Sequence, residues 1–446
     1  MGRRWTRSFA VSFLCASIAA CSDSTGPGTD SELALDFCAS DAPIFFAYQN
    51  DGGAWTALTP DASVTYHVPA TEKIALAFVH QFGSSYSTEV IYGTRSELEP
   101  LAGVNCTDAA GSKTLNGSVT GASLGSDVWI TMADQTTVVS PPPSTFSLNF
   151  LPDGVLDLVA NRDAFTVNST VPDRIIVRRA INLTNGATMP ALDFASAEAL
   201  APATNSLTIS GMLAGETTSL DVAFSTATVQ DHDLYYVPSF TTSPQAIYSI
   251  PATLTQAGDS HTLDVYASDP HTTGYRGVMQ FYRTPADRVA ALGPALSQPT
   301  FSALSASPVV RVRMTLPVQA QYSSFANAYH VQTNGATSRV VSVTGTAGYF
   351  GSIGTWELDI PDLSSLSGYP IASGIQPSLS YASEAQAYGG SASLFFGGAP
   401  EEGEVLKYAG YDNPNATVSS ASLRAPQSTR APRREIRNPF ARMRGR

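Results

Sequence analysis

The chain has 446 residues, enough for several ordinary domains, and 43% of them are hydrophobic while only 14% are charged. Low charge with abundant small polar residues, glycine and proline argues against a charge-rich helical protein and favours exported β-structure. The formal net charge is −12, and this excess of acidic residues argues against nucleic acid as a partner of the protein.

The first twenty residues have the pattern of a bacterial secretion signal. Three arginines precede an uncharged apolar stretch, 8–20, which is shorter than the roughly twenty apolar residues that a membrane-spanning helix needs. The stretch ends in Ile18-Ala19-Ala20-Cys21. This quartet resembles the lipobox of bacterial lipoproteins. The resemblance implies that the signal peptide, 1–20, is removed and that Cys21 becomes the lipidated first residue, which makes the membrane a partner.

The residues after Cys21 fit a tether. Residues 22–30 contain no apolar residue to bury, so we expect 21–32 to serve as lipid anchor and flexible linker. Ser22, rather than an aspartate, follows the cysteine. By the same resemblance, this implies retention at the outer membrane of a two-membrane bacterium, facing the periplasm or the surface. The alternative is an ordinary signal peptide with a chance cysteine.

With Cys15 removed in the signal peptide and Cys21 lipidated, two cysteines remain for pairing, Cys38 and Cys106. Because an exported chain meets an oxidising compartment, we predict a disulfide that closes the first folded domain, 33–109. On the chain-entropy model it would stabilise that domain by about 4 kcal/mol. Neither a CxxC nor a paired-histidine spacing accompanies these cysteines, so we expect neither a metal site nor a cofactor.

Strand patterns follow one another along the first domain. Apolar or alternating runs predict strands, a turn is expected where Asn, Asp and Gly cluster, and Ser96 is expected to cap a single helical turn. The predicted strands are 44–48, 54–58, 74–79 and 88–92, with the turn at 50–53.

From residue 110 onward, weak internal repetition predicts further β-units. The run 115–121 is echoed by 207–211, and the run 156–160 is echoed by 263–267. We interpret 146–160 as a hairpin turning at Pro152-Asp153-Gly154. Alternating strands with frequent turns predict an all-β fold of tandem small β-sandwich-like domains. The expected domains after the first are 110–203, 204–305 and 306–412.

Two further segments are predicted from pattern. Residues 286–292 form the best short helix candidate, ended by Gly293-Pro294. The C-terminal segment, 413–446, is expected to be disordered and basic. It carries eight arginines against one acid, Glu435. Its candidate partners are lipid phosphates, an anionic polysaccharide or the acidic body of the chain, and the alternative is a solvated tail without a partner. The arginines predicted to bind an anion are Arg430, Arg433, Arg434, Arg437, Arg442, Arg444 and Arg446.

Three motifs are weak candidates for chemistry. Gly258-Asp259-Ser260-His261 resembles the nucleophile block of GDS-type esterases, but the α/β scaffold and the late Asp-x-x-His of that family are missing, so a turn is favoured. A calcium loop over 149–157 would lack donors because Leu151 occupies a ligand position. Asp231-His232-Asp233 would place its carboxylates and its imidazole on opposite faces of a strand.

We therefore expect a non-enzymatic binding or structural module of the cell envelope, with no catalytic residue and no metal site. One alternative is an envelope hydrolase with Ser260 as nucleophile. The other is a carbohydrate-binding module that uses Trp55, Trp129 and Trp356. An exposed Ser260 near a base would favour the hydrolase, whereas an exposed coplanar tryptophan pair would favour sugar binding.

Overall fold

The chain folds almost entirely into β-strands, which confirms the predicted all-β class. The structure, a computed structural model, describes residues 32–37, 42–59, 65–69, 71–99, 101, 113–122, 126–140, 144–165, 170–229, 231–269, 273–391, 394 and 400–413. The α-helices whose bounds fall within these ranges are the single turns α1 (Arg95–Leu98) and α2 (Ala347–Phe350). None of the described helices is long and apolar enough to cross a membrane.

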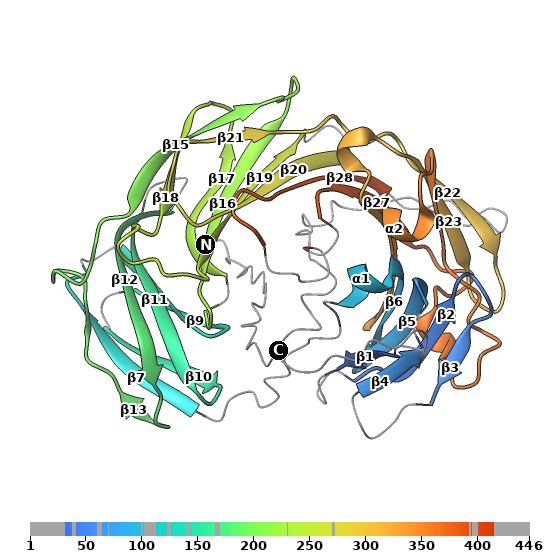
Figure 1. Ribbon diagram of the computed structural model, residues 1–446, viewed down its shortest axis with the longest axis horizontal. Helices are drawn as coiled ribbons and strands as arrows, with labels where there is room; N and C mark the ends of the chain where they lie inside the picture. The colour runs from blue at the N-terminus through green and yellow to red at the C-terminus, as the bar shows by residue number, and fades with distance from the viewer. Residues whose placement is uncertain are drawn as a thin grey trace, which may run out of the picture.

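Sixteen strands join into one continuous sheet. Hydrogen-bonded neighbours follow the order β3-β2-β5-β6-β25-β24-β27-β28-β20-β19-β16-β17-β12-β11-β8-β9. The sheet bends into an open arc, with β1 and β4 near one tip and β7 and β13 near the other (Figure 1). Smaller sheets of two to four strands pack against it. The arc therefore has a concave face and a convex face.

The strands fall into four successive units along the chain. Unit 1 contains β1 (Glu32–Asp36), β2 (Phe45–Asn50), β3 (Thr56–Leu58), β4 (Thr65–Pro69), β5 (Lys73–Phe82) and β6 (Ser85–Thr94). Unit 2 contains β7 (Lys113–Thr120), β8 (Ser126–Met132), β9 (Gln135–Val139), β10 (Thr145–Leu151), β11 (Val155–Phe165), β12 (Thr170–Asn182), β13 (Ala187–Thr188) and β14 (Leu192–Asp193). Unit 3 contains β15 (Ala203–Ser210), β16 (Thr217–Ser225), β17 (His232–Phe240), β18 (Gln245–Ser249), β19 (Ser260–Ser268), β20 (Gly274–Tyr282) and β21 (Arg288–Ala291). Unit 4 contains β22 (Thr300–Ser305), β23 (Arg311–Pro317), β24 (Phe325–Asn334), β25 (Thr337–Thr346), β26 (Thr355–Asp359), β27 (Ala382–Gly389) and β28 (Val405–Asn413).

All four units share one topology. Each unit contributes two hairpins to the large sheet, and the first strands of the two hairpins lie side by side, as β2 and β5 do in unit 1. The strands that precede the two hairpins pair antiparallel in a separate outer sheet, as β15 and β18 do in unit 3. The sequence echoes lie on equivalent strands of this topology: β7 matches β15, and β11 matches β19.

Three local predictions are wrong. Residues 146–160 do not form a hairpin, because β10 pairs with β7 in an outer sheet while β11 joins the large sheet. The connection is an arch, which lets Leu148 and Leu158 face one another in the same core. Residues 286–292 do not form a helix: β21 pairs parallel with β15, with Ala290 buried and Val289 exposed in a period of two. Thr94, rather than Ser96, caps the helical turn α1, where it forms a capping box with Glu97.

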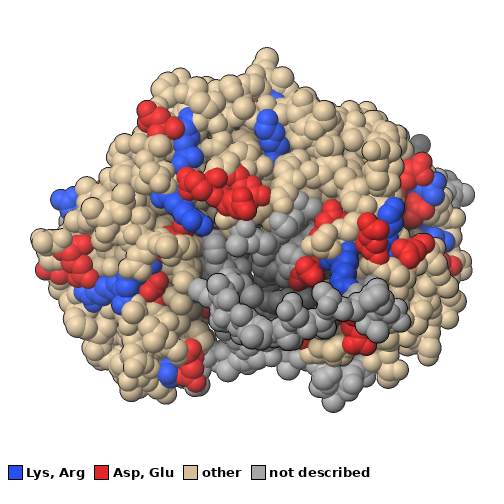
Figure 2. Space-filling model, in the orientation of Figure 1, with Lys and Arg blue, Asp and Glu red and all other residues tan. Residues whose placement is uncertain are grey.

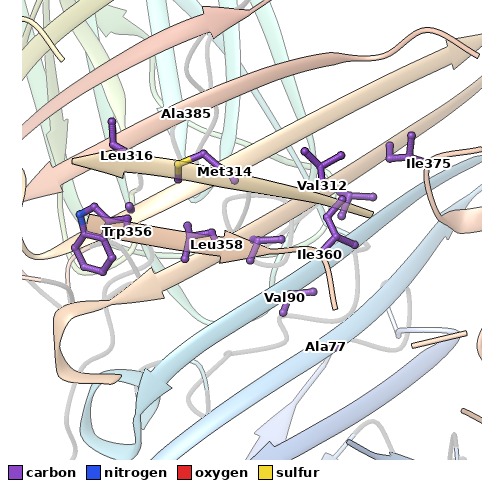
Figure 3. Close-up of a cluster of buried hydrophobic side chains, with 14 of the residues drawn as sticks. Ala77, Val90, Val312, Met314, Leu316, Trp356, Leu358, Ile360, Ile375 and Ala385 are labelled. Carbon is purple, nitrogen blue, oxygen red and sulfur yellow. The ribbon is translucent and has the colours of Figure 1, made fainter. Parts of the chain in front are cut away.

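The outer sheets cover different faces of the large sheet. Unit 4 covers the convex face with β22, β23 and β26, and its apolar residues also pack on Ala77 and Val90 of unit 1 (Figure 3). The outer strands of unit 1, β1 and β4, cover the opposite, concave face with residues such as Leu33 and Val68. The outer sheet of unit 3 likewise packs on Val159 of β11 in unit 2. The next residue of that strand, Leu158, points to the opposite face and packs against the outer sheet of unit 2. Units 1 and 2, which form the two ends of the large sheet and which we call the terminal units, are thus covered on both faces. The outer sheets of units 3 and 4, the middle units of the large sheet, lie on the convex side.

Candidate functional site

The concave face of the middle units carries an unusual set of polar side chains. Six adjacent strands form it, in the order β24-β27-β28-β20-β19-β16. Because side chains alternate along a strand, every second residue of these strands faces the concave side. We define the concave floor as nine of the polar and tyrosine residues at these positions: Asp221, Asp264, Tyr266, Tyr275, Glu384, Gln386, Tyr388, Tyr408 and Asp412.

Two tyrosine hydroxyls bind carboxylates across the junction between units 3 and 4. The hydroxyl of Tyr408 on β28 donates to Asp264 Oδ1 on β19, at 2.7 Å. The hydroxyl of Tyr275 on β20 donates to Glu384 on β27. Each bond therefore spans one intervening strand and joins one unit to the other.

A glutamine extends this network within unit 4. Gln386 Nε2 donates to the Tyr275 hydroxyl at 2.9 Å and to Glu384 Oε1 at 2.6 Å. Its carbonyl oxygen accepts from the hydroxyl of Tyr388. The rings of Tyr266 and Tyr275 stack beside it, with centroids 5.5 Å apart and planes at 28°.

Tyr275 and Tyr408 are held in their protonated form. Burial raises the pKa of Tyr275 well above its usual value, and the negative charge of Glu384 raises it further. Burial and the charge of Asp264 do the same to the pKa of Tyr408. Both hydroxyls therefore act as hydrogen-bond donors to carboxylates throughout the physiological pH range.

Four carboxylates on the floor form two directly opposed pairs. Asp221 on β16 is the register partner of Asp264 on β19. Glu384 on β27 is likewise the register partner of Asp412 on β28. Like charges directly opposite one another on a sheet are destabilising. The two opposed pairs thus concentrate negative charge on the floor.

No basic side chain shares this face within the six strands. Reading every second residue of β16, β19, β20, β24, β27 and β28 gives four carboxylates and neither lysine nor arginine. Along the inner border of the arc, acidic side chains gather with a few basic ones among them (Figure 2). Cations on the sheet face itself must therefore come from outside these strands.

The alternative of a hydrolase with Ser260 as nucleophile is not supported by the surroundings of Ser260. Ser260 is only 4% exposed. Its neighbour His261 is fully buried, with Nε2 accepting from the amide of Ile250 at 2.9 Å and Nδ1 3.3 Å from the carbonyl oxygen of Tyr282. Asp259 is bound by Arg179 at 2.5 Å. Both imidazole nitrogens are thus engaged elsewhere, which leaves His261 unsuited as a base for Ser260.

His232 is also a structural residue. It is fully buried, with Nδ1 2.8 Å from Thr131 Oγ1 and Nε2 2.6 Å from Asn161 Oδ1. Burial lowers its pKa to about 3, so the ring is neutral. Asp231 faces Ser225 instead. Among the described residues, no group of three His, Cys, Asp or Glu could hold a metal ion.

The three tryptophans do not form a sugar-binding platform. Trp356 is 1% exposed in the core between units 1 and 4. Trp55 is half-buried against that core, and its ring meets Tyr92 edge-on at 6.4 Å. Trp129 lies on β8 at the other end of the large sheet. Trp129 is therefore far from the other two, and the burial of Trp356 excludes a coplanar exposed pair of the kind that sugar stacking would use.

The remaining predicted site residues lie outside the described part of the chain. These are Cys21, Cys38, Cys106 and the arginines of the C-terminal segment. Phe37, which precedes Cys38, and Leu101, which lies five residues before Cys106, belong to one hydrophobic cluster. In the comparisons with known proteins, no family model matches the chain and no curated protein matches it.

The concave floor was missed from the sequence. Its only local signal is the alternation of polar and small residues in runs such as Glu384-x-Gln386-x-Tyr388, a spacing that places them on one face of a strand. That spacing could have predicted a polar face for β27. It could not have placed that face beside β20 and β19, which lie more than a hundred residues earlier in the chain.

Proposed function

We propose that the chain is a lipid-anchored, exported protein of a bacterial cell envelope and acts as a non-enzymatic binding module. The concave floor is its binding surface. The observation that supports this most is the presence of two opposed carboxylate pairs, Asp221 with Asp264 and Glu384 with Asp412. A cationic ligand would offset the repulsion within both pairs.

The chemistry of the floor favours guanidinium groups. The planar fork of an arginine can donate two hydrogen bonds to one carboxylate, and its face stacks on aromatic rings. The floor offers both partners, since Asp264 and Glu384 are carboxylates and the ring of Tyr266, which stacks on the buried ring of Tyr275, is only partly buried. The proposed ligand class is therefore a basic peptide or an arginine-rich segment of a protein.

A probe experiment tests the binding role. A soluble chain from Ser22 to Asn413 keeps every described residue, and a cooperative thermal transition checks that it is folded. We expect it to bind an oligo-arginine peptide in a calorimetric titration, with affinity that falls as salt rises, because such pairs are screened. We expect Asp264→Asn/Glu384→Gln to weaken binding on the order of tenfold.

The amide replacements keep the acceptors for the tyrosine hydroxyls, so the variant is expected to fold. The matched control is Asp134→Asn/Glu357→Gln, which removes the same charge from a turn and from the outer strand β26. Equal affinity of the floor variant and this control would refute the proposed surface.

A second experiment tests the anchor. Replacement of Cys21 by alanine removes the proposed site of lipid attachment, and two or more acyl chains are needed for stable anchoring. We expect the Cys21→Ala protein to move from the membrane fraction to the soluble fraction, while Ser22→Ala stays in the membrane. Membrane association of Cys21→Ala equal to that of the unaltered chain would rule out the anchor.

A further inference from the structure

We infer that the arginine-rich C-terminal segment, residues 424–446, docks in cis on the concave floor of the same chain. This inference rests on the proposed function of the floor as a cation-binding surface. It identifies residues 424–446 of the same chain as a ligand of that surface. The segment would then limit access of other basic ligands to the floor.

The chain leaves the fold at the floor itself. Strand β28 contributes Tyr408 and Asp412 to the floor and ends one residue later, at Asn413. It is the eighth of the sixteen strands in the large sheet. The C-terminal segment therefore starts in the middle of the sheet, next to the carboxylate pair of Glu384 and Asp412.

The segment is long enough to reach every floor residue. Asp221, on β16, lies three strands away from β28, which corresponds to about 14 Å at the usual spacing of about 4.8 Å. The ten residues between Asn413 and Arg424 can span about 35 Å when extended. All eight arginines lie at or after residue 424, so the linker is long enough for each of them to reach the floor.

Charge and backbone chemistry are complementary. The segment 424–446 carries eight arginines and one acid, whereas the floor carries four carboxylates. Pro426, Pro432 and Pro439 disfavour a continuous helix and favour an extended chain. An extended chain can lay successive guanidinium groups along the sheet.

Covalent linkage allows individually weak ion pairs to hold the segment on the floor. Exposed ion pairs contribute little individually, but a short flexible linker gives the tethered segment an effective concentration in the millimolar range. A tethered arginine segment is therefore expected to compete with a free basic peptide for the floor. Anionic lipid and anionic polysaccharide, the other candidate partners of the segment, would leave the floor open.

The test compares oligo-arginine binding to three lipid-free proteins that all start at Ser22. They are the chain to Asn413, the chain to Arg446, and the chain to Arg446 with its eight C-terminal arginines replaced by glutamine. We expect the first and third to bind the probe with equal affinity and the second to bind on the order of tenfold more weakly. High salt should reduce the difference.

The outcomes separate the two proposals. If the chain ending at Asn413 binds the probe and the chain ending at Arg446 binds it equally well, docking in cis is overturned and the proposed function stands. If the chain ending at Asn413 does not bind the probe, the proposed function fails. Vesicles of phosphatidylglycerol provide the third arm: vesicle binding by the chain ending at Arg446, with its affinity for the probe equal to that of the truncated chain, would assign the segment to lipid and refute docking on the floor.

Discussion

Tyr275 lies directly over Gly410, its register partner on the neighbouring strand, and its ring fills the space that a β-carbon at Gly410 would occupy. Two residues further along the same pair of strands the arrangement is reversed, with Tyr408 over Gly277. An aromatic ring over a cross-strand glycine restores packing that the glycine cannot supply. Because β20 belongs to unit 3 and β28 to unit 4, these two pairs hold the middle of the arc together and aim both hydroxyls at carboxylates.

A methyl group at Gly410 should open this junction. Gly410→Ala places its β-carbon in the ring of Tyr275, and overpacking of this kind costs about 1–3 kcal/mol. The measurement is the free energy of unfolding in urea. Gly354→Ala is the control, because its added methyl meets no atom within 4 Å. Equal stability of the two variants would show that the tyrosine–glycine pairs do not hold the junction.

A buried ion pair anchors the outer sheet of unit 3 to the large sheet. The side chains of Arg276 and Glu216 are 2% and 7% exposed, and Arg276 also donates to the carbonyl oxygens of Gly211 and Gly293. Glu216→Gln leaves a buried guanidinium without a compensating charge, which should cost about 3 kcal/mol.

The matched control for that pair is on the surface. Asp359 binds Arg313 in a similar two-bond geometry, but the two side chains are 31% and 38% exposed. Asp359→Asn should therefore cost less than about 1 kcal/mol. Similar losses for the two substitutions, measured by denaturant unfolding, would argue against burial as the reason for the difference.

Three buried histidines should make the fold sensitive to mild acid. Burial lowers the pKa of His232, His261 and His330 to about 3, whereas an unfolded histidine titrates near its ordinary value of about 6.5. Below that value the unfolded chain binds protons that the folded chain does not. Stability is therefore complete above about pH 6.5 and falls as the pH drops toward 3, by about 2 kcal/mol per histidine at pH 5.

The pH dependence can be assigned by substitution. His232→Gln should flatten the fall in thermal midpoint between pH 7.5 and 5, although it lowers the midpoint itself by breaking the bonds to Thr131 and Asn161. His67→Gln is the control, since the His67 side chain is 60% exposed. An unchanged slope for His232→Gln would contradict the assignment.

Cys38 and Cys106 are predicted to form a disulfide. Their pairing would close the chain around the cluster that contains Phe37 and Leu101, and its loss should destabilise the protein by about 2–4 kcal/mol. Mass spectrometry of a non-reduced digest of freshly isolated protein should find the two peptides linked. Two free thiols in that sample would exclude the disulfide.

Local pattern predicted the strands well and their partners poorly. Alternation and turn chemistry indicated β2, β5 and β6 close to their true positions. The same signals could not separate a hairpin from an arch, since Pro152-Asp153-Gly154 suits both, and only the sheet joined by each arm distinguishes them. The short run at β21 has helix-forming residues, and its parallel pairing with β15 overrides that preference.

The candidate site depends on contacts between distant segments. Asp264 and Tyr408 are 144 residues apart, and Tyr275 and Glu384 are 109 apart. Their meeting requires unit 4 to return along the edge of unit 3, so that β28 pairs with β20. The spacing of residues along the chain does not predict that pairing, whereas the predicted signal peptide and the arginine-rich segment rest on local sequence patterns.

The most direct test of the account locates the bound cation. A photoreactive oligo-arginine peptide is irradiated with the soluble chain that ends at Asn413, and cross-linked peptides are identified by mass spectrometry. We predict cross-links on β19, β20, β27 and β28, lost with excess unlabelled probe and reduced in Asp264→Asn/Glu384→Gln. Cross-links confined to the outer sheets, or equally strong in that variant, would contradict the concave floor as the binding surface.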